Sequence, residues 1–592
     1  MVSSIRVDRD IPMEMRDGTL LRGDIYRPDD NERHPAILMR TPYNKLLAPY
    51  SDYLSFIDTA FAGYAVIAQD VRGRFTSDGK YLRDQIIETE GPDGYDTVEW
   101  VAAQRWCDGN VGMAGASYNA HLQWIAAMEK PPHLKAIAPW VSGSGLLLDD
   151  NALSGIVRLR VAAYWTPWMG MDIADKLQKE GNDVSEMRRM IGRALANPEE
   201  VYSYLPLKDV PHFQFDGLRE IWYRRVMAAV PTLDLLESVY WPYPTDSVFD
   251  KVHWAYSEVQ APCFHVGGWF DIFSNSIFEN FRNMRQKGGS QRAREGQHLL
   301  IGPWAHDSRL SNCLGDFTFG LEATGGGARL TPRHIQFYNK YLLGMDIEIP
   351  AVTYFVMGLN QWRYADTWPL PQAQWQRFFL HSKGHANTAG GDGLLSRKEP
   401  GSEPTDAFVY DPHSPVPTVG GRNTRQAGEL SGPLDQSHIE QRADILCYTT
   451  ERLQEDTEVT GPLVLHLFAS ISTRDTDFTA KVVDVYPDGQ AYNIADGVIR
   501  ARYRKSVFQP ELVNTGKVNE YIINMWNTSY LFRKGHRIRI DISSSNFPRF
   551  DRNMNTGNPI GEDAQGISAT QTVYHTTDCQ SYIDLPVIPA TS

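Results

Sequence analysis

The stretch Gly112–Met128 constrains the fold more than any other part of the chain. Small and apolar residues lead to Ser117, and an amphipathic run over 121–128 follows directly. This order is typical of a strand, a sharp turn and a helix. At such a turn the serine hydroxyl is pushed out of the backbone, beside the free N–H groups of a helix N-terminus, which favour an anion. Both features suit a nucleophile whose product is a tetrahedral oxyanion.

The turn departs from the usual nucleophile elbow, Gly-x-Ser-x-Gly, because Asn119 occupies the last position. Asn tolerates strained or left-handed backbone better than other non-glycine residues, so we expect the departure to be mild. An ordinary tight turn with an exposed serine would give the same short pattern. The assignment of Ser117 therefore depends on the rest of the chain.

Strands and helices alternate around this stretch. Asp17-Gly18, between two alternating runs, predicts a hairpin. Buried strands are expected at 35–40, within 61–70 after a helix end, between Asp108-Gly109 and Ser117, and at 134–141, 262–268 and 298–302. Helices are expected at 94–102, 274–285 and 332–343. Strands with near-continuous apolar runs that alternate with helices indicate an α/β fold, with a mostly parallel sheet covered on both faces.

Two changes of character divide the chain, which is too long for one domain at 592 residues. From 146 to 245 the apolar residues fall at helical spacing, which predicts a helical cap over the carboxyl edge of the sheet. We therefore expect an α/β-hydrolase core formed by residues 1–145 and 246–349, with the cap at 146–245 between its two parts.

A second β-rich region follows from residue 350 to residue 592. Its short strands alternate polar and apolar residues, beginning with Val352–Val356, and we expect turns at Asp488-Gly489 and Asp496-Gly497. This pattern is typical of a β-sandwich.

Charge and cysteine usage exclude several classes of protein. The formal net charge of −14 argues against nucleic acid as the main partner. No window has the length and apolarity of a membrane span, and the N-terminus lacks the apolar region of a signal peptide. Five scattered cysteines predict neither a disulfide framework nor a zinc site. We expect a cytoplasmic protein without cofactor or metal; its oligomeric state stays open, a homodimer being one alternative.

An acid and a base follow Ser117 in the order found in α/β-hydrolases, each directly after a strand. Asp271 follows the strand at 262–268, and His306 follows the strand at 298–302. A serine hydroxyl becomes a good nucleophile when an imidazole takes its proton, and a buried carboxylate holds that imidazole in the right tautomer. We therefore predict a triad of Ser117, His306 and Asp271.

Each member of this triad has a simpler alternative. Asp271 would also serve as the N-cap of the following helix, and His306 would also form a loop pair with Asp307. Two other histidines lie at the start or middle of strands, and two other acids precede their strand. The competing residues are His253, His265, His298, Asp246 and Asp250.

Aromatic residues extend the predicted site. Tyr43 also ends a strand, and its phenol would donate a hydrogen bond to an oxyanion together with the backbone N–H of Tyr118. Trp165, Trp168 and Phe273 are candidates for an apolar substrate pocket. Ordinary core, loop or cap packing would explain each of these aromatic residues equally well.

Several longer motifs spread over nearly the whole chain. They are Arg40–Lys45, Asp70–Arg74, Asp93–Thr97, Gly115–Tyr118, Gly268–Asp271, Gly302–His306, Thr460–Pro462, Asp475–Lys481 and Asp496–Arg500. With these motifs the chain resembles the cocaine esterase family of serine hydrolases, which is related to X-prolyl dipeptidyl aminopeptidases. The resemblance implies an α/β-hydrolase core, a helical cap and a C-terminal jelly roll. It also implies the catalytic roles given above for Ser117, Asp271, His306, Tyr43 and Tyr118.

One departure from the family pattern is Ala120, which replaces the last glycine of the family's elbow and should press on helix–sheet packing. The expected activity is cofactor-free hydrolysis of a small-molecule ester through an acyl-Ser117 intermediate. An amidase or an X-prolyl-type aminopeptidase is the alternative, and the peptidase would need a carboxylate to hold the substrate ammonium. A carbohydrate- or protein-binding module with an inactive core is a third hypothesis, which an intact triad argues against.

Overall fold

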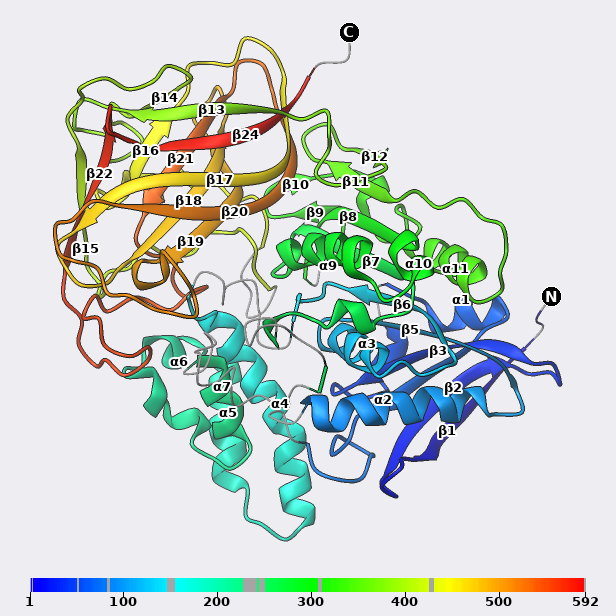
Figure 1. Cartoon of the computed structure of the whole chain (residues 1–592). Coiled ribbons are helices and arrows are strands. Elements are labelled where there is room, and N and C mark those ends of the chain that lie inside the picture. Colours follow the sequence, from blue (N-terminus) through cyan, green and yellow to red (C-terminus); the bar gives the residue numbers. More distant parts are fainter. Residues whose placement is uncertain are drawn as a thin grey trace.

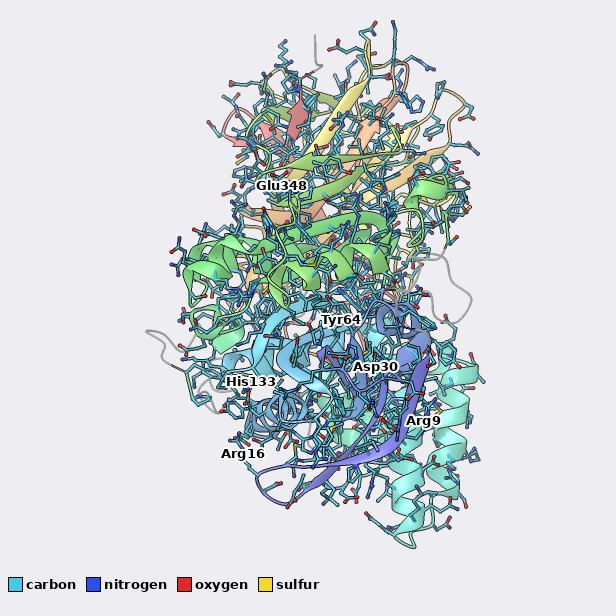
Figure 2. The ribbon with its side chains drawn as sticks, turned by 90° about the vertical axis from the view of Figure 1, so that its right-hand side faces the viewer. Arg9, Arg16, Asp30, Tyr64, His133 and Glu348 are labelled. Atoms are coloured by element: carbon cyan, nitrogen blue, oxygen red, sulfur yellow. The ribbon has the colours of Figure 1, made fainter. Side chains whose placement is uncertain are left out.

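The structure, a computed structural model, consists of a core, a helical cap and a β-sandwich (Figure 1). It describes residues 2, 4–50, 53–81, 86–145, 155–226, 242–243, 251–306, 311–424 and 431–589. Figure 2 views the molecule from the side, with the sandwich at the top, the core below it and the cap helices at the lower right; Arg9 lies on the N-terminal hairpin.

The core is built on a ten-stranded sheet in the order β1-β2-β4-β3-β5-β6-β7-β8-β11-β12. The strands from β4 to β11 along this order are parallel, and the strands beyond them at both edges are antiparallel. Their bounds are β1 Ile5–Glu14, β2 Leu20–Pro28, β3 His34–Thr41, β4 Ala65–Asp70, β5 Cys107–Ala116, β6 Leu134–Trp140, β7 Cys263–Phe270, β8 Gln297–Ala305, β11 Val352–Val356 and β12 Gln361–Ala365.

Helices cover both faces of this sheet. Side chains of α2, α3, α9 and α10 share one buried cluster with one face, and side chains of α1 and α11 share another with the opposite face. Their bounds are α1 Phe56–Phe61, α2 Ile86–Ala102, α3 Tyr118–Met128, α9 Ser274–Lys287, α10 Gln291–Glu295 and α11 Leu330–Tyr341. The doubly covered parallel sheet expected from the apolar strand runs is therefore present.

At one edge of the core sheet a local prediction is confirmed, and at the other edge a local prediction is wrong. The hairpin of β1 and β2 has its turn at Asp17-Gly18, where Gly18 adopts φ 82°. The assignment of Val352–Val356 to the sandwich is wrong, because this strand, β11, pairs in parallel with β8. An apolar run of five residues is compatible with either sheet. It joins the core sheet because it pairs with the otherwise open edge of β8.

The described part of the cap contains four α-helices, which share a buried apolar cluster of their own. They are α4 Leu159–Lys179, α5 Ser185–Ala196, α6 Glu199–Ser203 and α7 Leu218–Val226. In Figure 1 they lie below the sandwich and beside the core. Of the predicted cap region, residues 146–154, 227–241 and 244–245 lie outside the described residues.

The sandwich joins strands in the order β15-β22-β17-β24-β13-β14-β16-β21-β18-β19, with β20 paired to β17 and β23 to β22. The bounds are β13 Gln374–His381, β14 Leu394–Ser396, β15 Asp406–Tyr410, β16 Leu446–Thr449, β17 Thr457–Ile471, β18 Asp477–Val485, β19 Ala491–Arg500, β20 Asn519–Phe532, β21 Arg537–Ser543, β22 Ala569–Thr576, β23 Cys579–Gln580 and β24 Tyr582–Ile588. A small hairpin, β9 Cys313–Leu314 with β10 Phe317–Thr318, precedes it.

One of the two turns expected in the sandwich is not a turn. Asp488-Gly489 lies between β18 and β19, as predicted, but Asp496-Gly497 lies inside β19. The Asp496 carboxylate binds two buried guanidinium groups, those of Arg422 and Arg549, and this tertiary contact outweighs the local turn preference of an Asp-Gly pair.

The core and the sandwich share one apolar interior. Trp269, Phe278 and Val356 of the core belong to the same buried cluster as Leu463 and Phe478 of the sandwich. The five cysteines are all free, and no helix among the described residues is long and apolar enough to cross a membrane.

Candidate active site

Three of the predicted residues directly follow the carboxyl ends of core strands. Ser117 follows β5, Asp271 follows β7 and His306 follows β8. Phe270 and Ala305 are register partners in the β7–β8 pair, so the next residues, Asp271 and His306, leave the sheet side by side. The structure therefore brings the acid and the base together at one edge of the sheet, two and three strands from the strand that carries Ser117.

The backbone at Ser117 is strained. It adopts φ 59° and ψ −121° between β5 and α3, and its N–H donates to the Trp140 carbonyl at 3.0 Å. Non-glycine residues rarely adopt such a conformation, and it is concentrated at functional sites. The turn therefore presents the serine at the N-terminus of α3, as the sequence predicted.

The residues around Ser117 explain its unusual motif. Gly115 has φ 141°, and a Cβ placed on it would lie 2.6 Å from the Cβ of Asn119. Asn119 itself lies within α3, and the strained residue is Ser117. Ala120 is fully buried within the same helix.

Gln123 is a buried residue of this turn that the sequence analysis missed. Its Nε2 donates to the carbonyl of Gly115 at 3.0 Å and to that of Asn119 at 3.4 Å, and its Oε1 accepts from the N–H of Ala138 at 3.0 Å. It thus ties β5, α3 and β6 together just below the turn. A single amide within the otherwise apolar run 122–128 was the signal for this role.

The carboxylate of Asp271 is fully buried and held on both oxygens. Its Oδ2 lies 2.7 Å from Nδ1 of His306, and its Oδ1 accepts from the N–H of Phe273 at 2.6 Å. When Nδ1 donates to the carboxylate, Nε2 of His306 carries the lone pair that can take a proton. This is the arrangement that a general base requires.

The other histidines and acids considered above have different surroundings. His265 bonds Gln297 and His298 bonds Tyr341, and burial lowers the pKa of each imidazole to about 4. His253 precedes β7 rather than following a strand. Asp246, Asp250 and Asp307 lie outside the described residues.

A continuous set of ring contacts connects Tyr118 to His306. The ring of Tyr118, the residue after Ser117, lies 6.3 Å from His121, which lies 5.8 Å from Phe273. Phe273 in turn lies 5.7 Å from His306. The serine turn and the His306–Asp271 pair therefore border the same aromatic-lined region, to which Phe273, one of the predicted pocket residues, contributes.

Tyr43 also contacts Tyr118. Its ring is 6.3 Å from that of Tyr118 and stacks on Trp168 at 4.6 Å. Its hydroxyl oxygen accepts from Nε1 of Trp165 at 3.1 Å. A hydroxyl that already accepts is oriented so that its own hydrogen points elsewhere, which is the requirement for a donor to an oxyanion. The structure thus gathers Tyr43, Trp165 and Trp168 beside the turn.

The loop that carries Tyr43 is fixed by residues of other segments. The Asp70 carboxylate accepts from the N–H of Lys45 at 2.7 Å, and Arg74 donates from Nε to the Pro42 carbonyl at 3.0 Å. Arg74 also donates to the carbonyl of Met169 in α4 at 3.1 Å, so it joins this loop to the cap. Burial raises the pKa of Asp70 to about 6, against the opposing effect of Lys45.

Two guanidinium groups stack on the aromatic residues of this region. Arg158 lies 4.9 Å from the ring centroid of Phe273, and Arg225 lies 4.4 Å from that of Trp165. Trp165 and Phe273 are themselves buried, whereas Trp168 is partly exposed. Within the described ranges, no group of three or more His, Cys, Asp and Glu side chains is arranged to hold a metal ion.

The doubly covered parallel sheet, the strained serine between strand and helix, and the histidine–carboxylate pair at the same sheet edge define the class of protein: an α/β-hydrolase. Residues 17–308 match the family model described as X-Pro dipeptidyl-peptidase (S15 family), and residues 348–584 match the X-Pro dipeptidyl-peptidase C-terminal non-catalytic domain. The chain is 35% identical to cocaine esterase of Rhodococcus sp. (strain MB1 Bresler), over 98% of both chains. It therefore belongs to the cocaine esterase family and is a hydrolase, as the motifs indicated.

Solved structures agree with this fold. The chain superposes at a TM-score of 0.77 on an aminopeptidase from the marine sediment archaeon Thaumarchaeota archaeon, which is 26% identical and is covered to 96%, with 99% of this chain. An α-amino acid ester hydrolase also gives a TM-score of 0.77, at 23% identity, with 98% of this chain and 96% of that one covered. The core, cap and sandwich are thus a shared architecture.

Proposed function

We propose that this protein is a serine hydrolase of carboxylic esters that works through an acyl-Ser117 intermediate. The observation that carries the proposal is the 2.7 Å contact between His306 and the buried Asp271, at the sheet edge where the strained Ser117 turn also lies. This combination supports the roles of nucleophile, base and orienting acid that acyl transfer needs.

In the proposed reaction Nε2 of His306 takes the Ser117 hydroxyl proton as Oγ attacks the ester carbonyl carbon. The N–H of Tyr118 and the hydroxyl of Tyr43 then donate to the oxyanion. His306 returns the proton to the departing alkoxide, which leaves as the alcohol, and the acyl group remains on Ser117. A water, deprotonated by His306, attacks this ester, and collapse of the second tetrahedral species releases the carboxylic acid and regenerates the hydroxyl of Ser117.

An ester is the favoured substrate because of the charges near the site. A peptidase acting on an N-terminus needs a carboxylate to bind the substrate ammonium. Two cations, Arg158 and Arg225, stack on the predicted pocket aromatics and would repel such an ammonium group. Asp172 of α4 is buried and engaged by Arg74 at 3.3 Å. The cocaine esterase relative, named for an ester, points the same way.

An aminopeptidase is the second candidate. It is supported by the family model described for X-Pro dipeptidyl-peptidases and by the 26% identical archaeal aminopeptidase with the same architecture. Amides use the same nucleophile and base, so the two candidates differ in how the substrate is bound rather than in the chemistry at Ser117.

Two measurements test the proposal. The first compares hydrolysis of p-nitrophenyl esters with that of aminoacyl and Xaa-prolyl p-nitroanilides; we expect turnover of the esters, and turnover of the anilides alone would replace esterase by peptidase. The second is labelling with a fluorophosphonate probe, which we expect in the wild type and not in Ser117→Ala. Ser142→Ala is the matched control, because Ser142 is a buried serine that accepts from Trp124 at 3.1 Å and has no role in the proposed reaction.

A further inference from the structure

Arg422 of the sandwich reaches into the core and binds the strand that carries Asp271. Its side chain is 1% exposed, and its Nε donates to the carbonyl of Trp269 at 3.1 Å. Trp269 is two residues before Asp271 in the chain. The remaining guanidinium nitrogens bond the sandwich itself, through the carbonyl of Asp496 at 3.0 Å and that of Asn527 at 3.1 Å.

The carbonyl of Trp269 needs this donor because the β7–β8 pairing is irregular there. Register runs from Gly268 with Gly302 to Phe270 with Ala305, so one extra residue of β8 is accommodated at this point. A bulge interrupts the ladder and changes the direction of the side chains that follow it. A buried carbonyl left without a donor would cost stability, and Arg422 satisfies it from outside the sheet.

The stretch of β7 that faces this bulge lies immediately before the acid. On its far side the N–H of Asp271 donates to the Gly268 carbonyl at 3.1 Å, and the Asp271 carboxylate meets His306 at 2.7 Å. The indole of Trp269 is held as well, by the carbonyl of Phe355 at 2.7 Å. The direction of the carboxylate therefore depends on how the backbone at Trp269 is fixed.

We propose that Arg422 is a positioning residue that acts through the end of β7, opposite the bulge in β8, to direct Asp271 at His306. This inference rests on the proposed role of Asp271 as the acid that orients His306. The sandwich matches a family model described as a non-catalytic domain. The proposal gives it a direct part in shaping the active site. Arg422 fits this part because its planar, permanently charged fork bonds three backbone carbonyls at once.

The sandwich provides a matched control in Arg549. This arginine is also buried, at 5% exposure, and binds the same Asp496 carboxylate at 2.6 Å. It is a sandwich residue next to Phe550, whose ring its guanidinium overlies at 4.6 Å, and it is outside the proposed reaction. Arg422→Gln and Arg549→Gln therefore each break a buried ion pair with one shared acid, but only the first removes the donor to Trp269.

The test measures kcat, KM and urea stability of both variants on a p-nitrophenyl ester. We expect Arg422→Gln to lower kcat about 10- to 100-fold with little change in KM, because a small misplacement of a catalytic group costs this much. Arg549→Gln should keep kcat within about twofold even where its stability falls.

Equal losses of kcat in the two variants, or none in Arg422→Gln, would overturn the proposal. If Arg422→Gln does not fold, Arg422→Lys replaces it, since it keeps the charge beside Asp496 without the fork.

A second comparison uses Asp271→Asn as the background. If Arg422 acts through Asp271, adding Arg422→Gln to Asp271→Asn should lower kcat no further; a further loss equal to that in the wild type would overturn the proposal. In Arg422→Gln alone, the pKa of His306 read from the pH profile of kcat/KM should fall, because a displaced carboxylate stabilises the imidazolium less. Full activity of Asp271→Asn by itself would instead contradict the proposed function, so the two failures are distinguishable.

Discussion

The Ser117 turn and the Tyr43 loop lie at the ends of neighbouring strands, β5 and β3, yet they are held in different ways. Contacts of the Ser117 turn come from the nearby segment 115–140, through Gly115, Gln123 and Trp140. Contacts of the Tyr43 loop come from Asp70, from Arg74 and from the cap residue Trp165.

The Ser117 turn is therefore encoded by a short motif, whereas the Tyr43 loop depends on contacts that only the complete fold provides. A turn made of consecutive strand, loop and helix is encoded by its local sequence. Its strained backbone persists because the neighbouring residues hold it in place. A loop held by distant side chains is correct only when the cap and the core are both in place. Substitutions at the two sites should therefore fail in different ways.

The largest effect is expected for Gly115→Ala. Its new Cβ would lie 2.6 Å from that of Asn119, and the backbone φ of 141° disfavours any side chain. We expect a loss of about 2–4 kcal/mol in the free energy of unfolding and at least about a 100-fold lower kcat, because the turn cannot keep its shape. Urea denaturation and ester turnover measure the two effects.

The double variant Gly115→Ala with Asn119→Gly sharpens this prediction. Removing the opposing Cβ relieves the clash, so part of the lost activity should return, while the strain of the backbone remains. A double variant as inactive as Gly115→Ala alone would show that backbone strain, not the contact with Asn119, makes the glycine necessary.

For the Tyr43 loop the expected loss is smaller and purely kinetic. Tyr43→Phe should lower kcat about 100-fold, as the removal of one oxyanion donor does. Trp165→Phe leaves the hydroxyl but removes the N–H that orients it, and we expect about a 10-fold loss. Trp222→Phe is the control, since this buried cap indole donates to the Leu207 carbonyl instead. The variant that combines Tyr43→Phe with Trp165→Phe should be no slower than Tyr43→Phe alone, because the hydroxyl that Trp165 orients is already absent. A further loss of kcat would show that Trp165 acts by another route.

The same contrast explains which features could be predicted from the sequence. Asp271 and His306 could be placed because each directly follows an apolar strand, and parallel strands bring their ends to one edge. Asp496-Gly497 was misread as a turn because the partners of its carboxylate, Arg422 and Arg549, are far away in the chain. The bonds of Arg74 and Gln123 could not be predicted for a related reason: the sequence can mark such a residue, but it does not show which backbone carbonyl a buried side chain will bind.

A pH-dependent effect should also distinguish the two regions. The pKa of Asp70 is raised by burial to about 6 from an ordinary 3.8, so between these values the folded state holds a proton that the unfolded state has released. Its contribution to stability is therefore greatest below about pH 4 and is lost as the pH rises through about 6, by up to about 3 kcal/mol. Asp70→Asn should flatten the free energy of unfolding over this range, as urea titrations from pH 4.5 to 7.5 would show. An unchanged slope would rule out Asp70 as the source.

The smallest effect is expected for Ala120→Gly, which restores the glycine of the family pattern. Ala120 is fully buried in α3, and a helical glycine costs about 1 kcal/mol. We expect a loss of stability of this size, with kcat changed less than about twofold, because the strained residue is Ser117. A gain in stability would mean that the alanine methyl group crowds the helix against the sheet, as the sequence suggested.

The apolar cluster shared by Trp269, Phe278 and Val356 with Leu463 and Phe478 has an evolutionary consequence. The two family models meet between residues 308 and 348, but the interior of the molecule continues across that junction. Recombination at this point would join a core to a foreign sandwich whose buried surface does not match. The core and the sandwich must therefore be inherited together, and their substitutions should compensate one another as those within a single domain do.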